Sequence, residues 1–411
     1  MTIATAMPTA QTLIMAGGRG ERLYPLTASR PKPAVPFGGI FRIVDFTLSN
    51  CLNSGLKNVT LLTQYKHEEL QSYIRQGWSR LWSGYSPEPL VCLPPRGEQR
   101  YRGTADAVFQ NMGELESCGP EPVLILSADH VYHMDYRRLL SYHADTKADL
   151  TIATVEHALT AAKDYGVVEV DDELRVVGFQ EKPATPCPLP SNRAGALINM
   201  GVYVFKRELL MNALNENCNT GNGFDFGHHI IPSLIGSAHI RAYEFRDEAK
   251  QAPRYWRDIG TIDAYYETNM DLVRPGKRFD PYANPKWPSY PSSRAHSSRS
   301  VRARLLTRCR VRRSILSPGV QIEEGGVIES SVLMSGVSVG KDARIRHAII
   351  EEGVQVPAGV EIGFDLDNDR KYHFVTASGV VVVTQAAILT ETTVATTPRQ
   401  TASKVRLFRS A

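Results

Sequence analysis

A repeat of 17 residues in the last third of the chain constrains the fold more than any other feature of the sequence. One pattern recurs three times at this step, as Gly319-Val320-Gln321-Ile322, Gly336-Val337-Ser338-Val339 and Gly353-Val354-Gln355-Val356. Three aliphatic positions per 17 residues, with glycine, proline and small polar residues between them, are typical of one triangular coil of a parallel β-helix. Each coil buries its aliphatic corners only against the next coil, so the sequence predicts a small β-helix over residues 314–384. A β-sandwich with coincidental spacing is the alternative, but it does not explain why several positions keep one register.

The first two thirds of the chain follow a different pattern, in which short apolar runs alternate with helical spacing. Strands are predicted at 12–15, 59–62 and 123–126, and a helix over 41–52. This alternation indicates a Rossmann-like α/β domain over residues 11–273, with a mainly parallel sheet and helices on both faces.

The charges are spread unevenly along the chain. The formal net charge is +4, from 47 Lys and Arg against 43 Asp and Glu. Between Arg274 and Ser314 there are twelve basic residues and one acidic residue, so the rest of the chain is net negative. Five prolines interrupt this basic run, which favours a linker over residues 274–313 rather than a nucleic-acid-binding fold. Residues 385–411 are rich in Thr, Ala and Ser and are predicted to form a mobile tail.

The cysteines and the apolar runs indicate the compartment. Six cysteines are scattered without the spacing of a metal site or a disulfide framework, as is usual for reduced cytosolic proteins. Residues 1–10 carry no basic side chain, and no apolar run approaches the roughly 20 residues needed to cross a bilayer. We therefore expect a cytoplasmic protein without a membrane segment.

A glycine-rich segment, Gly17-Gly18-Arg19-Gly20-Glu21-Arg22, closely follows the first predicted strand. Ligands of such sheets bind at the carboxyl ends of the strands. Glycines there let backbone amides turn around an anion without Cβ clashes, and Arg19 and Arg22 add the charge that a triphosphate needs. The spacing is neither that of a dinucleotide-binding turn nor that of a Walker A loop. The segment therefore predicts a triphosphate site, with an ordinary strand–helix turn as the alternative.

Lys32 follows this segment, between Pro31 and Pro33. Because the proline rings restrict the backbone on both sides, the sequence predicts that Lys32 is presented to a phosphate that gains charge during transfer. A solvated loop lysine is the alternative.

The pair Glu181-Lys182 ends another strand pattern. Lys182 is predicted to meet a sugar phosphate and Glu181 to accept hydrogen bonds from sugar hydroxyls. A charged turn is equally compatible with the sequence.

Two carboxylates are candidates for a metal site. Asp129 directly follows the strand at 123–126, and a carboxylate at such a strand end is how Mg²⁺ is usually held beside nucleotide phosphates. Its alternative role is to cap the next helix. Asp258, in the segment Tyr255-Trp256-Arg257-Asp258-Ile259-Gly260, is the second candidate. The sequence alone does not show whether the two carboxylates meet.

Taken together, these segments resemble the sugar-nucleotide pyrophosphorylases, and most closely the glucose-1-phosphate adenylyltransferases. The resemblance covers nearly the whole chain, from about residue 13 to 384, and depends on the order and spacing of several motifs. These are MAGGRGERL, RPKPAVPFGGIFRIVDFTLSNC, YRGTADAV, LSADHVY, EKP, NMGVYVF, DFGHHIIP and YWRDIGTIDAYYE.

The resemblance implies a nucleotidyltransferase domain followed by a left-handed β-helix. It also implies that ATP and α-D-glucose 1-phosphate give ADP-glucose and pyrophosphate, in bacterial glycogen biosynthesis. The positions that match the family's triphosphate loop are Gly17, Gly18, Gly20 and Arg22, and Lys32 matches its phosphate-facing lysine. The matches to the adenine and ribose contacts are Gln64, Tyr101 and Gly103, and Asp129 and Asp258 match the catalytic pair that binds Mg²⁺. The matches to the glucose 1-phosphate pocket are Glu181, Lys182, Asn199, Tyr203, Asp225, Phe226 and Trp256.

The sequence departs from the family pattern at three places. Asn199 stands where the family has Ser, which changes the reach of a polar group in the sugar pocket. Ser29 stands where the family has its activator lysine, although the effector residues Arg30 and Arg42 are retained. The linker motif Leu-Pro-Pro-Ala-Lys-Phe is absent. The resemblance further implies anionic allosteric effectors and a homotetramer.

Two other functions remain open at this point. The same chemistry on another nucleotide or sugar phosphate is one, because base choice depends on a few loop contacts. The other is a non-catalytic regulatory subunit of the same architecture. Such subunits tend to lose catalytic charges, whereas Arg22, Lys32, Asp129, Lys182 and Asp258 are all present here.

Overall fold

The computed structural model describes residues 10–82, 90–97, 100–113, 122–221, 223–276, 279–291, 304–305 and 308–385. The chain divides into two compact units, Met1–Ser300 and Val301–Ala411. Except for residue 385, the predicted tail lies outside the described residues.

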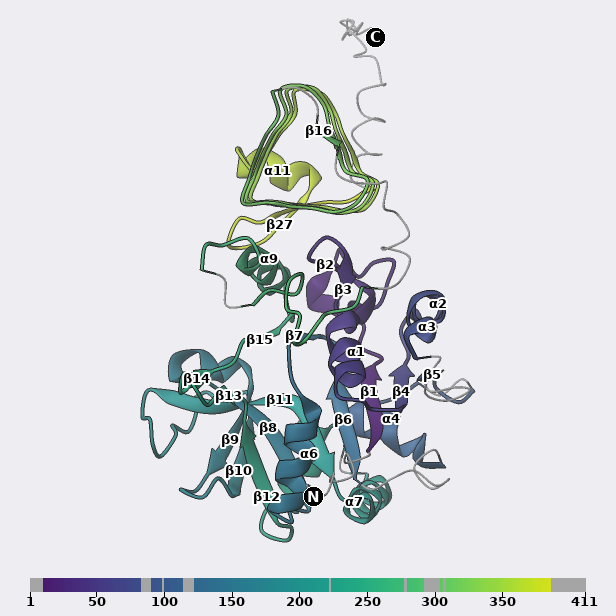
Figure 1. The fold of residues 1–411 in the computed structure, drawn as a ribbon, viewed down its shortest axis with the longest axis vertical. Helices are drawn as coiled ribbons and strands as arrows, with labels where there is room; N and C mark the ends of the chain where they lie inside the picture. The colour runs from purple at the N-terminus through teal and green to yellow at the C-terminus, as the bar shows by residue number, and fades with distance from the viewer. Residues whose placement is uncertain are drawn as a thin grey trace, which may run out of the picture. The chain divides into compact units, whose positions relative to one another are not determined.

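The first unit is built on a nine-stranded sheet (Figure 1). One half of the sheet is parallel, and its strands lie in the order β5 (Leu90–Leu93), β4 (Asn58–Thr63), β1 (Gln11–Ala16) and β6 (Val123–Ser127). This half confirms the strands predicted from the first apolar runs of the sequence.

The other half of the sheet is largely antiparallel, so the sheet as a whole is mixed. Strand β11 (Gly195–Phe205) pairs antiparallel with β6 and also with β8 (Leu150–Ala158) and β9 (Gly166–Val170). Strand β10 (Val176–Glu181) pairs antiparallel with β9, and β12 (Ile240–Glu244) pairs parallel with β8. A short turn joins β9 to β10, and such a turn can only connect antiparallel neighbours.

Helices cover both faces of this sheet, as predicted. Neighbouring residues of β1 point to opposite faces, so Ile14 packs in the same apolar cluster as helices α1 (Val44–Asn53) and α6 (Tyr136–Asp145). Leu13 packs in the opposite cluster, together with α4 (Thr104–Phe109) and α7 (Arg207–Thr220).

The helix predicted over 41–52 begins later than expected. Its first two residues form β3 (Phe41–Arg42), which pairs antiparallel with β2 (Pro36–Phe37). The other elements of this unit are η1 (Glu21–Leu23), η2 (Lys32–Ala34), α2 (His67–Tyr73), η3 (Ile74–Trp78), α3 (Ser79–Trp82), η4 (Leu159–Asp164), η5 (Phe226–Ile230), α8 (Ile231–Leu234), β13 (Arg246–Asp247), β14 (Ala252–Pro253) and α9 (Ile262–Asp271).

A separate two-stranded sheet joins two distant parts of the first unit. Strand β7 (His130–Tyr132) pairs antiparallel with β15 (Trp256–Asp258), in a register that sets Asp258 opposite His130. Because Asp129 immediately precedes β7, this pairing brings the two predicted carboxylates to the same place.

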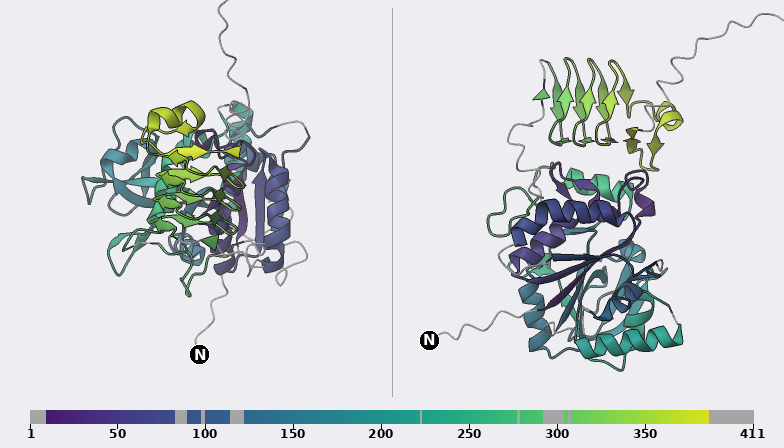
Figure 2. Two further views of the ribbon diagram at one scale, coloured as in Figure 1. Left: turned by 90° about the horizontal axis from the view of Figure 1, so that it is seen from above. Right: turned by 90° about the vertical axis from the view of Figure 1, so that its right-hand side faces the viewer.

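The second unit is a left-handed β-helix. Its stacked coils confirm the prediction from the 17-residue repeat, and its handedness is the one that the family resemblance implied. Figure 1 shows its triangular coils end-on and Figure 2 shows them stacked. Equivalent residues pair in register from coil to coil, for example Ile328 with Ile345 and Ile345 with Ile362, and all three are buried. The strands of the three faces are β16 (Arg304–Leu305), β19 (Gln321–Ile322), β22 (Ser338–Val339) and β25 (Gln355–Val356); β17 (Arg310–Arg312), β20 (Val327–Glu329), β23 (Arg344–Arg346) and β26 (Glu361–Ile362); and β18 (Ile315–Leu316), β21 (Val332–Leu333), β24 (Ala348–Ile350), β28 (Val381–Val383) and β27 (Phe374–Val375). Helix α11 (Leu366–Tyr372) lies between β26 and β27 along the chain, before β28 pairs with β24.

The structure corrects the linker predicted over 274–313 at both of its ends. Strands β16 and β17 pair with the next coil, so the β-helix begins before residue 314. At the other end, the Trp287 indole donates to Asn50 Oδ1 at 2.8 Å and the Tyr290 amide donates to Ser49 Oγ at 2.8 Å. The aromatic residues among the prolines therefore attach residues 279–291 to helix α1. The sequence prediction relied on the basic charges and prolines of this segment and did not consider its aromatic residues.

Within the described residues, no helix combines the length and apolar character that crossing a bilayer requires.

Candidate active site

Two adjoining cavities open at the carboxyl ends of β1 and β6, where the glycine-rich segment predicted a ligand. One has a volume of about 310 Å³ and the other about 330 Å³. Both are lined by Met15, Thr104, Ser127 and Asp129. The shared wall makes them two parts of one site, as a reaction between two substrates requires.

The first cavity, here called the nucleotide cavity, gathers most of the residues expected to bind ATP. Its lining includes Gly17, Gly18, Arg19, Gln64, Tyr101 and Gly103. The Gln64 amide accepts from the Tyr101 backbone N–H at 2.6 Å and donates to the Tyr101 carbonyl at 3.4 Å. This pair of bonds holds the loop that carries Tyr101 and Gly103 against the end of β4.

Gly20 and Arg22, which the sequence placed in the triphosphate loop, are not among the residues that line the nucleotide cavity. Gly20 has a φ of 68°, and a Cβ atom there would lie 2.8 Å from Lys32 Cβ. Gly20 therefore makes room for Lys32 rather than lining the nucleotide cavity. Arg22 lines the second cavity, where a Cβ atom on Gly260 would lie 3.2 Å from Arg22 Nη2 and 3.1 Å from Asp258 Oδ2.

The two carboxylates that the sequence left unconnected meet at the ammonium group of Lys32. Lys32 Nζ lies 2.7 Å from Asp129 Oδ2 and 3.3 Å from Asp258 Oδ1. Lys32 is 8% exposed, and it is the first residue of the 3-10 turn η2, which begins directly after Pro31 and includes Pro33. The structure thus confirms that Lys32 is not a solvated loop lysine.

Burial and charge act in opposite directions on this cluster. Burial alone would lower the pKa of the Lys32 ammonium, but attraction by Asp129 and Asp258 outweighs burial and raises the pKa. Burial alone would raise the pKa of Asp129, yet the charge of Lys32 and the hydrogen bonds from Lys32 and Ser127 hold the pKa of this carboxyl well below its usual range. Lys32 is therefore cationic and Asp129 anionic at neutral pH.

Two neighbours of Asp129 belong to the cluster, although the sequence analysis did not select them. Ser127 Oγ donates a hydrogen bond to Asp129 Oδ1. His130 Nε2 lies 3.4 Å from Asp129 Oδ1 and 3.8 Å from Asp258 Oδ1. The sequence does hold one signal for these two residues, because both lie within two positions of Asp129 at the end of an apolar strand.

The donor atoms around Asp129 suit a small hard cation. One ligand atom each of Asp129, His130 and Asp258 lies within 4.8 Å of the others. Carboxylate oxygens are the ligands that Mg²⁺ prefers, and it commonly takes only one or two of them from the protein beside substrate phosphates. The residues present therefore fit a Mg²⁺ ion.

The second cavity, here called the sugar cavity, contains all of the residues predicted to bind glucose 1-phosphate. They are Glu181, Lys182, Asn199, Tyr203, Asp225, Phe226 and Trp256. Lys182 has a φ of 48°, and its Nζ lies 3.6 Å from Glu181 Oε1.

A register shift in β11 shapes this cavity between Asn199 and Tyr203. Within it, Asn199 Nδ2 donates to the Tyr203 hydroxyl at 2.7 Å, and Asn199 Oδ1 accepts from the Gly201 amide at 3.0 Å. Asn199 is thus held by its own strand, which explains how the site accommodates a side chain longer than the serine of the family pattern.

The predicted effector residues lie outside the linings of both cavities. Arg42 Nη1 pairs with Glu69 Oε1 at 2.9 Å, and its guanidinium lies over the Tyr73 ring. Ser29 is exposed and its hydroxyl accepts a bond of 3.5 Å from Arg30 Nε. These contacts do not test whether Arg30 and Arg42 bind an effector, and that role stays a prediction.

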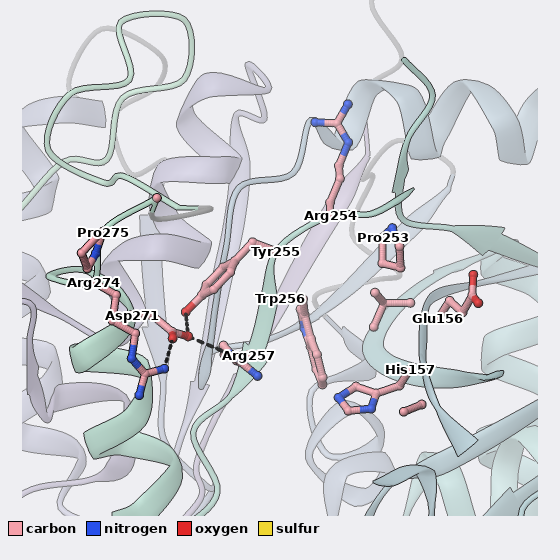
Figure 3. Close-up of a pocket in the computed structure, with 13 residues that line it drawn as sticks. Glu156, His157, Pro253, Arg254, Tyr255, Trp256, Arg257, Asp271, Arg274 and Pro275 are labelled. Atoms are coloured by element: carbon pink, nitrogen blue, oxygen red, sulfur yellow. Dashed lines mark hydrogen bonds and ion pairs between the residues drawn. The ribbon is translucent and has the colours of Figure 1, made fainter. Parts of the chain in front are cut away.

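A larger cavity of about 420 Å³ lies on the other side of β15 and shares only Trp256 with the sugar cavity (Figure 3). Its central carboxylate, Asp271, accepts from the Tyr255 hydroxyl at 3.0 Å, from Arg257 at 2.9 Å and from Arg274 at 2.9 Å. These bonds satisfy the carboxylate, so this cavity lacks the converging reactive groups of the two smaller ones.

Comparisons with known proteins agree with this geometry. A family model described as nucleotidyl transferase matches residues 11–274, and one described as GlmU-like, C-terminal hexapeptide matches residues 292–383. The chain is 42% identical to the glucose-1-phosphate adenylyltransferase of Koribacter versatilis, over 91% of this chain and 94% of that protein. It is 40% identical to that of Nitrosospira multiformis, over 90% of this chain and 93% of the relative. A protein of Alkalilimnicola ehrlichii named glucose-1-phosphate adenylyltransferase 2 is 41% identical, over 90% of this chain and 92% of the relative.

Proposed function

The chain belongs to the family of glucose-1-phosphate adenylyltransferases, and from this premise we propose that it joins ATP to α-D-glucose 1-phosphate. The products are ADP-glucose and pyrophosphate, and the pathway is glycogen biosynthesis. One observation carries the proposal: a nucleotide cavity and a sugar cavity share a wall at Asp129, where Lys32 and Asp258 converge.

The reaction we propose is an in-line displacement at the α-phosphorus of ATP. A phosphate oxygen of glucose 1-phosphate forms the new O–P bond, and the bond from the α-phosphorus to the α–β bridging oxygen of ATP breaks, so that pyrophosphate leaves with that oxygen. No covalent enzyme intermediate is needed. Positioning and charge neutralisation supply most of the acceleration in such transfers. Arg22 and Lys32 stabilise the developing negative charge, and Lys182 anchors the sugar phosphate.

Mg²⁺ is the cofactor that we propose, held by Asp129 and Asp258. When bound, it would neutralise charge on the reacting phosphates. Lys32 keeps the two carboxylates together before any cation enters, since its ammonium contacts both of them. Calorimetric titration of Mg²⁺ should show binding to the wild type and at least about tenfold weaker binding to Asp258→Asn. Equal affinity in the two proteins would contradict this assignment.

The choice of substrates is tested by pyrophosphorolysis of a panel of sugar nucleotides. We expect ADP-glucose to be consumed with a higher kcat/KM than UDP-glucose, dTDP-glucose, GDP-glucose or GDP-mannose. An equal response to UDP-glucose would refute the preference for ATP. No turnover with any member of the panel would instead support a non-catalytic subunit, although the five charged residues that favour catalysis all line the site or contact residues that do.

Three further properties follow the family resemblance and belong to the proposal. We propose that the enzyme is a cytoplasmic homotetramer, which light scattering would test against the chain mass of 45.6 kDa. We also propose regulation by anionic effectors near Arg30 and Arg42. Because Ser29 lacks the charge of the family's activator lysine, activation profiles with a panel of phosphorylated sugars would identify which anions still act.

A further inference from the structure

A loop that lines the nucleotide cavity is hydrogen-bonded directly to a loop that lines the sugar cavity. The first loop contains Gly103 and Thr104, and the second contains Phe224, Asp225 and Phe226, about 120 positions later in the chain. Thr104 lines both cavities. The contacts between the two loops therefore lie where the two substrates are expected to meet.

Backbone contacts set how close the two loops lie. The Ala105 amide donates to the Phe224 carbonyl at 2.8 Å. A Cβ atom on Gly103 would overlap this same carbonyl, so only glycine permits the approach. On the outer side, the Arg102 guanidinium lies 3.5 Å from the centroid of the Phe224 ring.

The hydroxyl of Thr104 makes two bonds to the sugar loop. It accepts from the Phe226 amide at 3.1 Å and donates to Asp225 Oδ2 at 3.0 Å. An amide N–H can only donate, so the hydroxyl accepts from Phe226 and its single proton is available for Asp225. The other carboxylate oxygen, Oδ1, accepts from the backbone amides of Gly227 and His228 at 2.9 and 3.1 Å.

We propose that Thr104 is a positioning residue, which orients the Asp225 carboxylate toward glucose 1-phosphate and links that orientation to the nucleotide loop. Two backbone amides hold Oδ1, which also lies 3.4 Å from His228 Nδ1. Within the part of the chain that the structure describes, the side chain that bonds Oδ2 is that of Thr104. Without the hydroxyl, Oδ2 loses this bond, and the bonds to Oδ1 alone do not fix the plane of the carboxylate. This inference rests on the proposed function, since it assumes that the sugar cavity takes glucose 1-phosphate.

The test compares Thr104→Val, which keeps the side-chain shape and removes the hydroxyl, with Thr104→Ser, which keeps the hydroxyl. We expect Thr104→Val to lower kcat/KM for glucose 1-phosphate about tenfold or more, since a bond to a charged group is lost. The KM for ATP should stay near that of the wild type, and Thr104→Ser should restore most of the activity. Thr146→Val is the matched control, because the Thr146 hydroxyl bonds the Tyr142 carbonyl at the end of α6, outside both cavities.

A double-mutant cycle with Asp225→Asn separates positioning from a general structural role. If Thr104 acts through Asp225, adding Thr104→Val to Asp225→Asn should change kcat/KM for glucose 1-phosphate by no more than about twofold. Fully additive effects, or a Thr104→Val enzyme with wild-type kinetics, would overturn the inference while leaving the proposed function intact. A wild-type protein that makes no ADP-glucose would overturn both.

Discussion

At the scale of single residues, the site depends on one buried cation between two carboxylates. Lys32 lies within 3.3 Å of both Asp129 and Asp258, and its charge keeps Asp129 ionised despite burial. Removing one member of such a cluster leaves another buried charge without compensation, which is costly. We therefore expect each of the three side chains to contribute to the stability of the fold as well as to the proposed reaction.

Replacement of Asp129 by Asn should separate these two roles. We expect turnover to fall about a hundredfold or more, because a charge aimed at the reacting groups is lost. The fold should survive, since Lys32 keeps Asp258 as a partner. Steady-state kinetics and urea denaturation measure the two effects. Asp149→Asn is a matched control, another lysine-paired aspartate but outside both cavities, and it should retain turnover. Near-wild-type turnover in Asp129→Asn would contradict the catalytic assignment.

At the scale of elements, residues 279–291 illustrate how a segment predicted to be a linker becomes part of a domain. His133, just after β7, bonds Ser289 Oγ through Nε2 at 2.7 Å, and its ring lies 4.4 Å from that of Phe279. The Tyr255 ring stacks on Phe279 at 4.8 Å. The segment is thus held by residues that directly adjoin β7 and β15, the two strands whose pairing joins the two carboxylates.

The burial of His133 makes the free energy of unfolding of the first unit depend on pH. Burial lowers the pKa of His133 to about 4, against about 6.5 for an unfolded histidine. Between these values the unfolded chain binds more protons than the folded one, so the free energy of unfolding falls as pH is lowered from 6.5 to 4. The loss from His133 amounts to at most about 3 kcal/mol.

His133→Gln tests this pH dependence directly. The variant should be less stable than the wild type at pH 7, and the difference should shrink toward pH 5 as the wild type loses the contribution of neutral His133. Urea denaturation at several pH values measures it. His143, whose pKa burial also lowers to about 4, remains in both proteins and cancels in the comparison. A difference that stays constant with pH would show that His133 does not titrate in this window.

At the scale of the whole molecule, the two units obtain their stability in different ways. The first unit buries two apolar clusters on the two faces of one sheet, with partners far apart in the sequence. The second buries one apolar column, in which each coil contacts the next coil 17 residues later. All four tryptophans of the chain, Trp78, Trp82, Trp256 and Trp287, belong to the first unit.

Ile345→Ala should therefore destabilise the second unit selectively. Ile345 is fully buried between Ile328 and Ile362, and its truncation should cost about 2–5 kcal/mol, against about 0.5–1.5 kcal/mol for Ile345→Val. Circular dichroism follows both units, whereas tryptophan fluorescence follows the first. We expect the dichroism transition to move to lower denaturant while the fluorescence transition stays in place. Equal shifts of both signals would show that the units unfold together.

The sequence by itself determined the features that depend on neighbours along the chain. The β-helix was readable because its core positions recur every 17 residues and pair in that register. Three strands of the parallel half were readable as apolar runs, and the glycine-rich segment and Lys32 predicted a phosphate site at the end of the first of them. For each of these features, the interacting residues are close in sequence or follow a fixed period.

Only the tertiary structure decided which distant segments meet. The pairing of β7 with β15 brings Asp258 to Asp129, and no local pattern specifies that pairing. The antiparallel half of the sheet, the packing of residues 279–291 and the bond from Thr104 to Asp225 were missed for the same reason. Long-range contacts of this kind form because apolar faces and buried polar groups must find partners somewhere in the fold, and the sequence pattern of either partner is satisfied by many alternatives.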